Sequence, residues 1–577
     1  MDGGHIIGEF LQKHGIKYLF TLCGGHISPI LVGAKDSGLT VIDTRHEANA
    51  VFAADAMSRL TGTPGVVAVT AGPGITNSVT ALKNAQMAQS PLILLGGSVA
   101  TVLKGRGALQ DIEQLELLES VTKWNASIEE DCDIIPLLEE AFDVAMGGVP
   151  GPVFLECPID LLYPEGYVRT FYGESMNKAK SLKEKVINWY LRRHVDKLFS
   201  CTPKGVEIAK KEDILPFSTD LEDIQKVASQ INNSQKPVLI LGSQATLRTE
   251  LVSELSEKLQ NFGIPIFLTG MARGLMGEEH PFYFRHKRSS ALREADLVII
   301  AGMPCDFRLG YGRVIHKEAY HIALNRSTED LELNKKPDLG IQTDPGTFLL
   351  ELLGDYSFDH SKWGDWHQVL REREEKGHAK ITRFAAKPTD YINPLVLCQE
   401  INKVMAENSI IVGDGGDFVA TASYTVKPRK PLTWLDPGPF GTLGVGAGFA
   451  MASKLANPQA EVWLLYGDGA AGYSILELDT MVRHHLPIIA VIGNDAGWTQ
   501  ITRDQVQYLN DEVGTTLTYN DYHLTAQSLG AKGILVDKEQ NLEEKLQLAK
   551  NYAKRGFPVL INARIGKTNF RKGSISM

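Results

Sequence analysis

The fold is decided by the segment VWLLYGDGAAGYS at residues 462–474, which is followed by IIAVIGNDAGW at residues 488–498. Each segment opens with a continuous apolar run, typical of a strand buried on both faces, and ends in a turn that contains glycine. Apolar residues at helical spacing between the two predict a helix, which Pro487 ends. Parallel strands joined by a helical crossover place Asp468 and Asp495 side by side at the carboxyl edge of one sheet.

Asp468 and Asp495 have the chemistry of a magnesium site. Mg²⁺ takes oxygen ligands in octahedral geometry, often one or two carboxylates together with the oxygens of a diphosphate. The backbone amides after Asp468 belong to small residues, which a diphosphate can approach closely. From these residues alone, a plain strand–helix–strand unit in which Asp468 caps its helix explains the Gly-Asp-Gly turn equally well.

The whole pattern resembles the cofactor motif of the thiamine diphosphate enzymes. In that family the first Asp, a second side chain that is most often Asn, and a backbone carbonyl two residues later hold the metal. By position these are Asp468, Asp495 and the carbonyl of Gly497, and a register one residue earlier makes Asn494 the ligand instead. The resemblance also implies cofactor contacts at Gly467, Gly469, Ala470 and Ala471, and at Gly415 and Gly416.

Strand and helix also alternate in the first part of the chain. Apolar strands are predicted at residues 18–22, 41–43, 65–70 and 91–96, each followed by a loop or a helical pattern. This rhythm predicts a doubly wound parallel sheet. Residues 151–165 are expected to complete it with an edge strand that prolines end.

Two loops of this first sheet resemble the pyrimidine-binding domain of acetolactate synthase and its relatives. They are Arg-His-Glu at residues 45–47 and AGPGITN at residues 71–77. By spacing alone, Glu47 is a first-turn Glu favoured by the helix dipole. In the family this Glu is catalytic, because it shares a proton with N1′ of the aminopyrimidine of the cofactor. The resemblance therefore implies that Glu47 is catalytic and that Thr76 and Asn77 contact the cofactor.

Three further residues are candidates for the active site. The segment GTLGVG at residues 441–446 resembles a family segment. The resemblance implies that Thr442 contacts the cofactor and that Leu443 is the bulky apolar residue that holds the cofactor in its folded conformation. An ordinary core leucine explains Leu443 as well. His26 stands where relatives carry a small or hydroxyl residue, and is a candidate for proton transfer or oxyanion contact. A buried histidine with satisfied hydrogen bonds is the alternative. Gln110 resembles the active-site Gln of the family.

The resemblance covers essentially the whole chain and implies an α/β protein of three doubly wound parallel-sheet domains. The predicted order is a pyrimidine-binding domain at 1–165, a basic helical linker at 166–219, a nucleotide-binding-like middle domain at 220–355, a second linker at 356–392 and a diphosphate-binding domain at 393–577. The end of the last domain, from Phe570, is polar enough to be expected as a mobile cover over the active site.

The first linker alternates basic and apolar residues, which predicts a basic amphipathic helix. Such a helix packs on the body of the protein, or lies against anionic lipid or a nucleotide phosphate. Its basic residues are Lys178, Lys180, Lys183, Lys185, Arg192, Arg193 and Lys197.

The middle domain resembles those that bind FAD in acetolactate synthases, and adenine nucleotide or coenzyme A in related enzymes. The resemblance therefore implies ADP, coenzyme A or FAD as its ligand. Arg273, Lys287, Arg288 and Arg308 are candidates to pair with phosphates, and each is equally explained as a surface charge.

Composition narrows the class of protein. A net charge of −10 argues against nucleic-acid binding as the main task. No apolar run reaches the length of a membrane span, and the start is not a signal peptide, so a cytoplasmic chain without a membrane anchor is expected. The six cysteines lack paired spacing, so neither a disulfide nor a zinc site is predicted. A reducing compartment is therefore expected.

The segments FTLCGGHISP at 20–29, LGSQA at 241–245 and GNDAGWTQ at 493–500 resemble the acetolactate-synthase-like branch that includes 2-hydroxyacyl-CoA lyases. The resemblance implies cleavage of a 2-hydroxyacyl-CoA to formyl-CoA and an aldehyde, or the reverse condensation. Acetolactate synthase, which joins two pyruvates, is the alternative. A noncatalytic binding subunit is a second alternative and predicts loss of Glu47 or the metal ligands. In the family, domains of two subunits form each site, which implies a homodimer or homotetramer.

Overall fold

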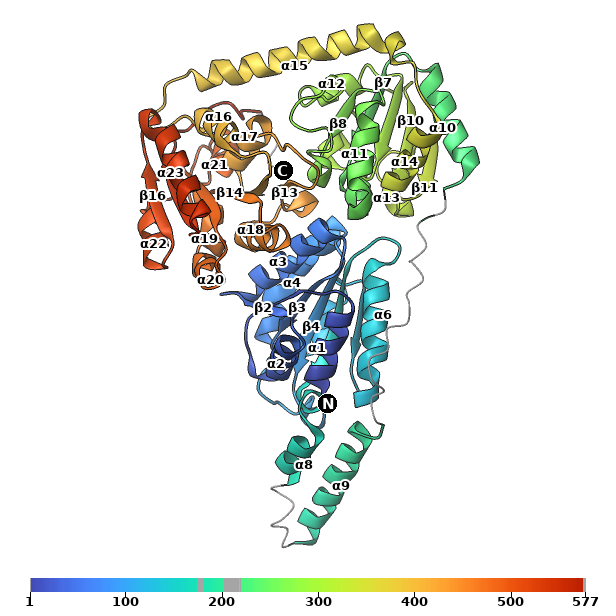
Figure 1. Cartoon of the computed structure of the whole chain (residues 1–577), viewed down its shortest axis with the longest axis vertical. Coiled ribbons are helices and arrows are strands. Elements are labelled where there is room, and N and C mark those ends of the chain that lie inside the picture. Colours follow the sequence, from blue (N-terminus) through green and yellow to red (C-terminus); the bar gives the residue numbers. More distant parts are fainter. Residues whose placement is uncertain (1, 174–180, 202–216, 218, 574–577) are drawn as a thin grey trace. The chain divides into compact units, whose positions relative to one another are not determined.

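The computed structural model describes residues 2–173, 181–201, 217 and 219–573 of the 577 residues (Figure 1). The chain divides into two compact units, residues 1–59 with 63–214, and residues 60–62 with 215–577. Within the described ranges there are three sheets, and all strand pairings within them are parallel. The predicted fold class is confirmed, while the domain boundaries stay predictions.

The first unit contains a six-stranded sheet in the order β2-β1-β3-β4-β6-β5. The expected edge strand near residue 152 is wrong: β6 lies inside the sheet and β5 forms the edge. The sequence WNAS of β5 is half-buried and has no apolar run, so the pattern gave no sign of it. The strands are β1 (Tyr18–Thr21), β2 (Thr40–Asp43), β3 (Gly65–Val69), β4 (Leu92–Ser98), β5 (Trp124–Ser127) and β6 (Pro152–Pro158).

Helices surround this sheet. Apolar residues of α1, α2 and α6 form one core with alternate residues of β3, β4 and β6, whereas α3 and α4 follow β2 and β3 and begin at the carboxyl edge. The helices are α1 (Gly3–Lys13), α2 (Ser28–Asp36), α3 (Glu47–Thr61), α4 (Pro73–Ala88), α5 (Gln114–Leu118), α6 (Ile134–Met146), α7 (Ile159–Leu162), α8 (Glu165–Gly173) and α9 (Leu182–Leu198).

The second unit begins with a five-stranded sheet in the order β11-β10-β9-β7-β8. Successive residues of β7 point to opposite faces: Leu239 and Leu241 pack with α10, α11 and α14, and Val238 and Ile240 with α12 and α15 (Gly364–Ala385). The strands are β7 (Pro237–Leu241), β8 (Ile266–Leu268), β9 (Leu297–Ala301), β10 (Tyr320–Asn325) and β11 (Leu339–Gln342). The helices are α10 (Leu221–Asn233), α11 (Val252–Gln260), α12 (Arg288–Leu292), α13 (Thr328–Glu332) and α14 (Pro345–Asp355).

A long helix, α15 (Gly364–Ala385), leads from this sheet to the third one, which has the order β13-β12-β14-β15-β17-β16 (Figure 1). The crossover predicted as one helix after β14 is two, α19 and α20. The strands are β12 (Ser409–Asp414), β13 (Trp434–Leu435), β14 (Glu461–Gly467), β15 (Ile488–Asn494), β16 (Lys532–Val536) and β17 (Val559–Arg564). The helices are α16 (Pro394–Val404), α17 (Asp417–Thr425), α18 (Gly446–Ala456), α19 (Asp468–Ser474), α20 (Glu477–Arg483), α21 (Thr499–Leu509), α22 (Tyr522–Ser528) and α23 (Leu542–Lys554).

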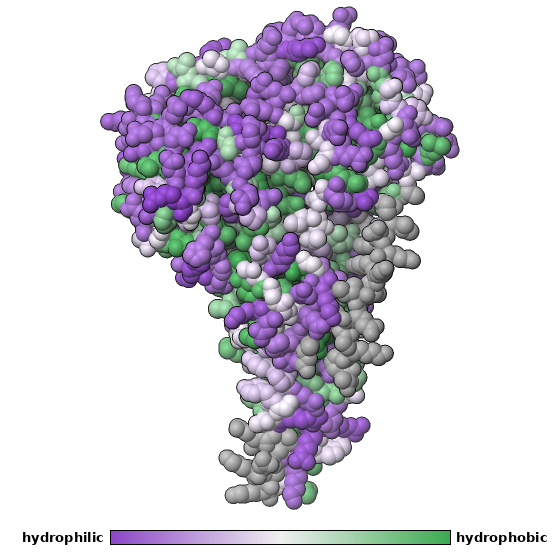
Figure 2. Space-filling view, viewed as in Figure 1, coloured by the Kyte–Doolittle hydropathy of each residue, from purple (hydrophilic) through white to green (hydrophobic). Residues whose placement is uncertain are grey.

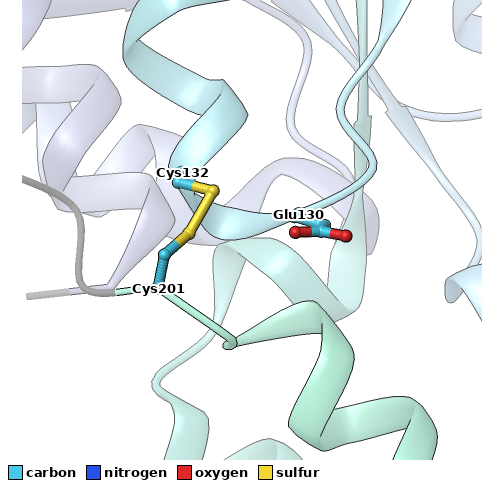
Figure 3. A group of neighbouring side chains, drawn as sticks. All are labelled: Glu130, Cys132 and Cys201. Carbon is cyan, nitrogen blue, oxygen red and sulfur yellow. A yellow bond between two sulfur atoms is a disulfide. The ribbon is translucent and has the colours of Figure 1, made fainter.

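A disulfide joins Cys132 to Cys201, so the expectation of no disulfide is wrong (Figure 3). Cys132 lies in a 3₁₀ turn before α6, and Cys201 follows the end of α9. The two are 69 residues apart, a separation that carries no pairing signal in the sequence. The bond forms because the fold returns the end of α9 to the body of the first unit, where Glu130 also lies beside the sulfurs (Figure 3).

The predicted basic helix is present as α9, with Lys178 and Lys180 outside the described residues. None of the helices in the described part of the chain is long and apolar enough to cross a bilayer. In the C-terminal tail, Phe570 is buried against Ile381 and Leu395, and residues 574–577 lie outside the described ranges, so the mobile cover stays a prediction.

The first unit offers a test of how α3 is fixed to α4. The buried carboxylate of Asp55 accepts two bonds of 2.7 Å from Arg59 and one of 2.9 Å from Asn84 on α4. Asp55→Ala leaves a buried guanidinium without its carboxylate, and should lower the free energy of unfolding of this unit by about 3 kcal/mol. Hydrogen exchange of α3 and α4, followed by mass spectrometry, measures the loss.

The control is Glu9→Ala, which removes a half-exposed ion pair with Lys13 and should cost less than about 0.5 kcal/mol. Equal hydrogen-exchange protection of α3 in Asp55→Ala and in the unaltered protein would contradict the assignment.

Candidate active site

The two predicted metal carboxylates lie at the ends of neighbouring strands. Asp468 begins α19 directly after β14, and Asp495 follows β15, which pairs with β14. Both are nearly fully buried. Burial raises the pKa of Asp468 to about 7, and the negative charge of Asp495 adds to the rise. A cation between the two carboxylates would keep both ionised, so this pair fits Mg²⁺.

The turn after β15 brings the third predicted ligand to the same place. The N–H of Gly497 donates to Oδ2 of Asp468 at 3.2 Å. Ala496, between Asp495 and Gly497, has a left-handed backbone with φ of 55°, which a side-chain-bearing residue adopts only when its surroundings hold it. This turn therefore positions the Gly497 backbone beside Asp468.

The runner-up ligand Asn494 is engaged elsewhere. Its Nδ2 donates to the Asn520 carbonyl at 3.3 Å and to Oδ1 of Asn562 at 3.1 Å, and its Oδ1 accepts from the N–H of Ala496. Asp495 lines a cavity at this edge of the sheet, and Asn494 does not. The geometry thus favours Asp495 as the ligand, and the assignment stays a prediction.

A cavity of about 620 Å³ opens in front of these carboxylates. Its lining includes most of the predicted cofactor contacts in this unit: Gly415, Gly416, Thr442, Leu443, Gly467, Gly469 and Ala470. Ala471 is fully buried and does not line it. A side chain at position 469 would lie 2.4 Å from the ring of Trp498, so only glycine fits under this wall of the cavity.

Asp414, which the sequence did not single out, holds the predicted wedge in place. It ends β12, is fully buried, and accepts the N–H of Gly444 at 3.1 Å and of Gly446 at 2.9 Å. Burial raises the pKa of Asp414 to about 7, and these N–H groups oppose the rise. Leu443, next to the clamped residues, projects into the cavity.

In the first unit, Glu47 is the first residue of α3 and is buried. Asn77 on α4 donates through Nδ2 to Oε2 of Glu47 at 3.0 Å. The fold therefore brings these two predicted residues together, and Asn77 orients the carboxylate. Thr76 is exposed at the start of the same helix, where its hydroxyl donates to the Pro73 carbonyl.

His26 lies at the same edge of the sheet, in the turn after β1. It is partly buried, and its Nδ1 is 3.2 Å from the hydroxyl of Thr70, at the end of β3. Burial lowers the pKa of His26, so the imidazole is neutral near pH 7. Gly97 packs closely against His26, since a Cβ added at Gly97 would lie 2.6 Å from the Cβ of His26. The position of His26 is therefore restricted, and its Nδ1 has a hydrogen-bond partner.

Gln110 has a left-handed backbone with φ of 67° and packs against Gly72, the residue before α4. The sequence missed its neighbour Gln114, which is buried and accepts the N–H of Gly72 at 2.9 Å. Gln114 also donates to Oε1 of the buried Glu156 at 2.9 Å. This network fixes the loop before α4, and no local sequence signal marks it because its members come from three separate segments.

Three of the four basic residues predicted in the middle domain, Arg273, Arg288 and Arg308, line the cavity, and Lys287 is exposed and does not. Arg308 pairs with Asp306 at 2.6 Å. Arg288 donates to the Arg308 carbonyl, and Arg273 lies over the Trp434 ring at 4.7 Å. Within the described residues, neither Arg273 nor Arg288 has a carboxylate at ion-pair distance, so this wall carries positive charge.

The fold and these sites define a class of enzyme. Family models described as "Thiamine pyrophosphate enzyme" match the chain in order: the N-terminal TPP binding domain at residues 1–117, the central domain at 224–352 and the C-terminal TPP binding domain at 414–563. The chain belongs to the thiamine pyrophosphate enzyme family.

Individual relatives of the chain show which members of the family it is most similar to among those compared. The 2-hydroxyacyl-CoA lyase 2 of Danio rerio is 47% identical over 582 residues, covering 100% of this chain and 93% of the relative. The enzyme of the same name from Homo sapiens is 46% identical over 586 residues, covering 100% and 92%. A probable acetolactate synthase of Mycobacterium bovis is 32% identical over 567 residues, covering 97% and 95%.

The contribution of Asp414 to the free energy of unfolding depends on pH. The folded pKa, about 7, lies above the ordinary value of 3.8, so the contribution of this group to stability is present below pH 3.8 and is lost as the pH rises through 7. Asp414→Asn cannot ionise. The stability of Asp414→Asn relative to the unaltered protein should therefore rise between pH 4 and pH 7, by a few kcal/mol in order of magnitude. Urea unfolding at several pH values measures this, and a difference independent of pH would contradict it.

The metal assignment is tested by Asp495→Ala. Removing one of two carboxylates should raise the Mg²⁺ concentration needed for half-maximal thiamine diphosphate binding by about tenfold or more. Asp495→Asn should retain binding, because the amide oxygen remains a ligand. Asn494→Ala is the control: it should lower stability and leave the Mg²⁺ dependence unchanged, and the reverse pattern would make Asn494 the ligand.

Proposed function

We propose that this chain is a thiamine-diphosphate-dependent 2-hydroxyacyl-CoA lyase, which cleaves a 2-hydroxyacyl-CoA to formyl-CoA and an aldehyde and can run the reverse condensation. The observation that carries the proposal is the pair of complete half-sites, Glu47 with Asn77 in one unit and Asp468 with Asp495 in the other. The whole-chain identity to 2-hydroxyacyl-CoA lyases supports the choice of reaction.

Thiamine diphosphate, when bound, supplies the electron sink that lets the C1–C2 bond of the substrate break. Asp468, Asp495 and the Gly497 carbonyl would hold Mg²⁺, and the glycine-lined wall beside Asp468 leaves room for the diphosphate. Leu443, next to the residues that Asp414 holds, would give the bound cofactor apolar support.

Glu47 would hold a proton at the aminopyrimidine nitrogen of the cofactor. Its burial would exclude water from this proton, and the hydrogen bond from Asn77 to Oε2 orients the carboxylate. During cleavage the 2-hydroxyl group must lose a proton and the formyl carbon must gain one. His26, neutral because burial lowers its pKa, can accept the first of these, with Gln110 as a polar contact at the same sheet edge.

The arginine wall suits the substrate. Coenzyme A carries phosphates, and burial lowers the pKa of Arg288, with the positive charges of Arg273 and Arg308 adding to the effect. An anion beside these guanidinium groups relieves that unfavourable crowding of like charge. We assign the wall to the phosphates of the acyl-CoA substrate, with ADP or FAD as other occupants of the middle domain.

Two alternatives differ in what they require. Acetolactate synthase joins two pyruvates and needs no coenzyme A, and the acetolactate synthase relative is more distant at 32% identity. A noncatalytic binding subunit should lack Glu47 or the metal carboxylates, and this chain has them all.

The half-sites lie in separate units, which supports a homodimer or homotetramer in which domains of two subunits complete each site. The cytoplasmic location expected from the sequence stays a prediction. The disulfide between Cys132 and Cys201 argues against the reducing compartment that this location implies.

The function is tested with the purified full chain, thiamine diphosphate and Mg²⁺, offered either a 2-hydroxyacyl-CoA or pyruvate, with products identified by mass spectrometry. We expect formyl-CoA and an aldehyde from the thioester. Acetolactate from pyruvate, with the thioester untouched, would overturn the proposal in favour of the synthase.

Glu47 is tested in the same assay. Glu47→Gln keeps the size and the contact with Asn77 but cannot share a proton in the same way, so turnover should fall by about 100-fold or more. Asn77→Ala should lower turnover less, since it disturbs only the orientation of Glu47. Matching circular dichroism spectra show that both variants fold, and a fully active Glu47→Gln would remove this residue from the mechanism.

A further inference from the structure

Helices α8 and α9 form a hairpin that extends from the body of the first unit (Figure 1). Its base is firmly attached. The Tyr172 hydroxyl donates to Asp160 at 3.1 Å, and Nε2 of His194 lies 2.8 Å from the Thr101 hydroxyl. The disulfide to Cys132 fixes the chain just beyond α9 (Figure 3). These contacts fasten the base of the hairpin to the body.

One face of α9 makes the attachment. Val195 packs in a small core with Val168 and Tyr172 of α8, and half-buried Leu191 joins them. Leu198 packs into the main core of the unit. These residues recur at helical spacing, so a single stripe of α9 is used for packing.

The opposite face of α9 is apolar as well, and it is exposed. Leu182, Val186 and Trp189 follow one another at steps of four and three residues, which places them in one apolar line along the helix, and the basic residue Arg193 lies at its end, four residues further on. Leu182 is 82% exposed and Trp189 60% exposed. On α8, Tyr167 and Phe171 are also largely exposed. Soluble surfaces seldom expose so many large apolar side chains together.

Basic side chains flank this line on both sides. Lys183 and Lys197 lie on one side and Lys185 and Arg192 on the other, with the Arg193 guanidinium 5.6 Å from the centre of the Trp189 ring. Lys183, Lys185, Arg192 and Arg193 have no acidic partner at ion-pair distance within the described residues. The helix thus carries an excess of positive charge in a chain whose net charge is −10.

We propose that the α8–α9 hairpin binds the surface of an anionic lipid bilayer through this exposed face. Leucine, valine, tryptophan and tyrosine enter the boundary between headgroups and acyl chains, while flanking lysines and arginines reach the lipid phosphates. Trp189 and Tyr190 have one apolar and one polar end, which suits that boundary.

The charge pattern favours lipid over a second copy of the hairpin. A second copy of the hairpin would bring the same basic flanks together, and like charges repel. On the face shown in Figure 2, the coloured residues at the lower end of the molecule are mainly hydrophilic, with hydrophobic residues only in isolated places and no broad apolar patch. A narrow apolar line between two basic rows is the pattern of a helix that lies in a membrane interface.

The test is co-sedimentation of the full chain with phosphatidylcholine vesicles, with and without phosphatidylserine. We expect binding to the vesicles that contain phosphatidylserine and none to phosphatidylcholine alone. Raising the salt concentration should weaken the binding, because it screens the attraction of the basic rows.

Two variants separate the apolar and the charged contributions. The double variant Leu182→Glu/Trp189→Glu should weaken vesicle binding by about tenfold or more. The double variant Lys185→Glu/Arg192→Glu should also weaken vesicle binding, and its effect should be larger at low salt than at high salt. The control is Leu221→Glu, which places the same charge at an exposed leucine at the start of α10. It should bind like the unaltered protein, and all variants should keep their turnover and oligomeric state.

Equal binding by Leu182→Glu/Trp189→Glu and the unaltered protein would overturn the proposal, as would the absence of binding to phosphatidylserine vesicles. A smaller oligomer in that variant without vesicles would also overturn it, because the face would then be an interface between copies of the chain.

Discussion

Two buried carboxylates of like charge at one edge of the third sheet set the main physical constraint on this structure. Asp468 and Asp495 are both nearly fully buried at the ends of neighbouring strands, an arrangement that costs free energy unless a cation compensates their charge. The surroundings conform to that need. In the turn at residues 495–497, Ala496 has a left-handed backbone conformation, and the N–H of Gly497 donates to Asp468. Position 469 has no room for a side chain. This geometry fits the Mg²⁺ ion and the diphosphate that the proposed function requires.

Much of this could be predicted from the sequence, because parallel strands impose local patterns. Apolar runs ending in glycine marked β14 and β15, and the strand ends then determined where Asp468, Asp495 and Glu47 must lie. What escaped prediction depends on contacts between distant segments. In the sequence Asp414 is an ordinary residue at the end of a strand, and its role comes from the hydrogen bonds that it accepts from the turn at 444–446. Likewise, the role of Gln114 comes from its hydrogen bonds with Gly72 and Glu156.

Other failures have the same origin in weak local signal. The half-buried strand β5 has no apolar run, so its neighbour β6 was mistaken for the edge. The bond between Cys132 and Cys201 follows from where the chain returns after α9, which cysteine spacing cannot show. The basic helix was predicted, yet which of its two apolar faces packs on the body required the structure.

The cavity before Asp468 draws its walls from two different domains. The wall with the carboxylates and Leu443 belongs to the third sheet, and the arginine wall to the second. In evolutionary terms, such a division lets the two walls diverge at different rates. Under the function proposed above, replacing residues around Arg273 and Arg288 would change which substrate binds without altering the carboxylate wall, so new specificities would arise most readily in the middle domain.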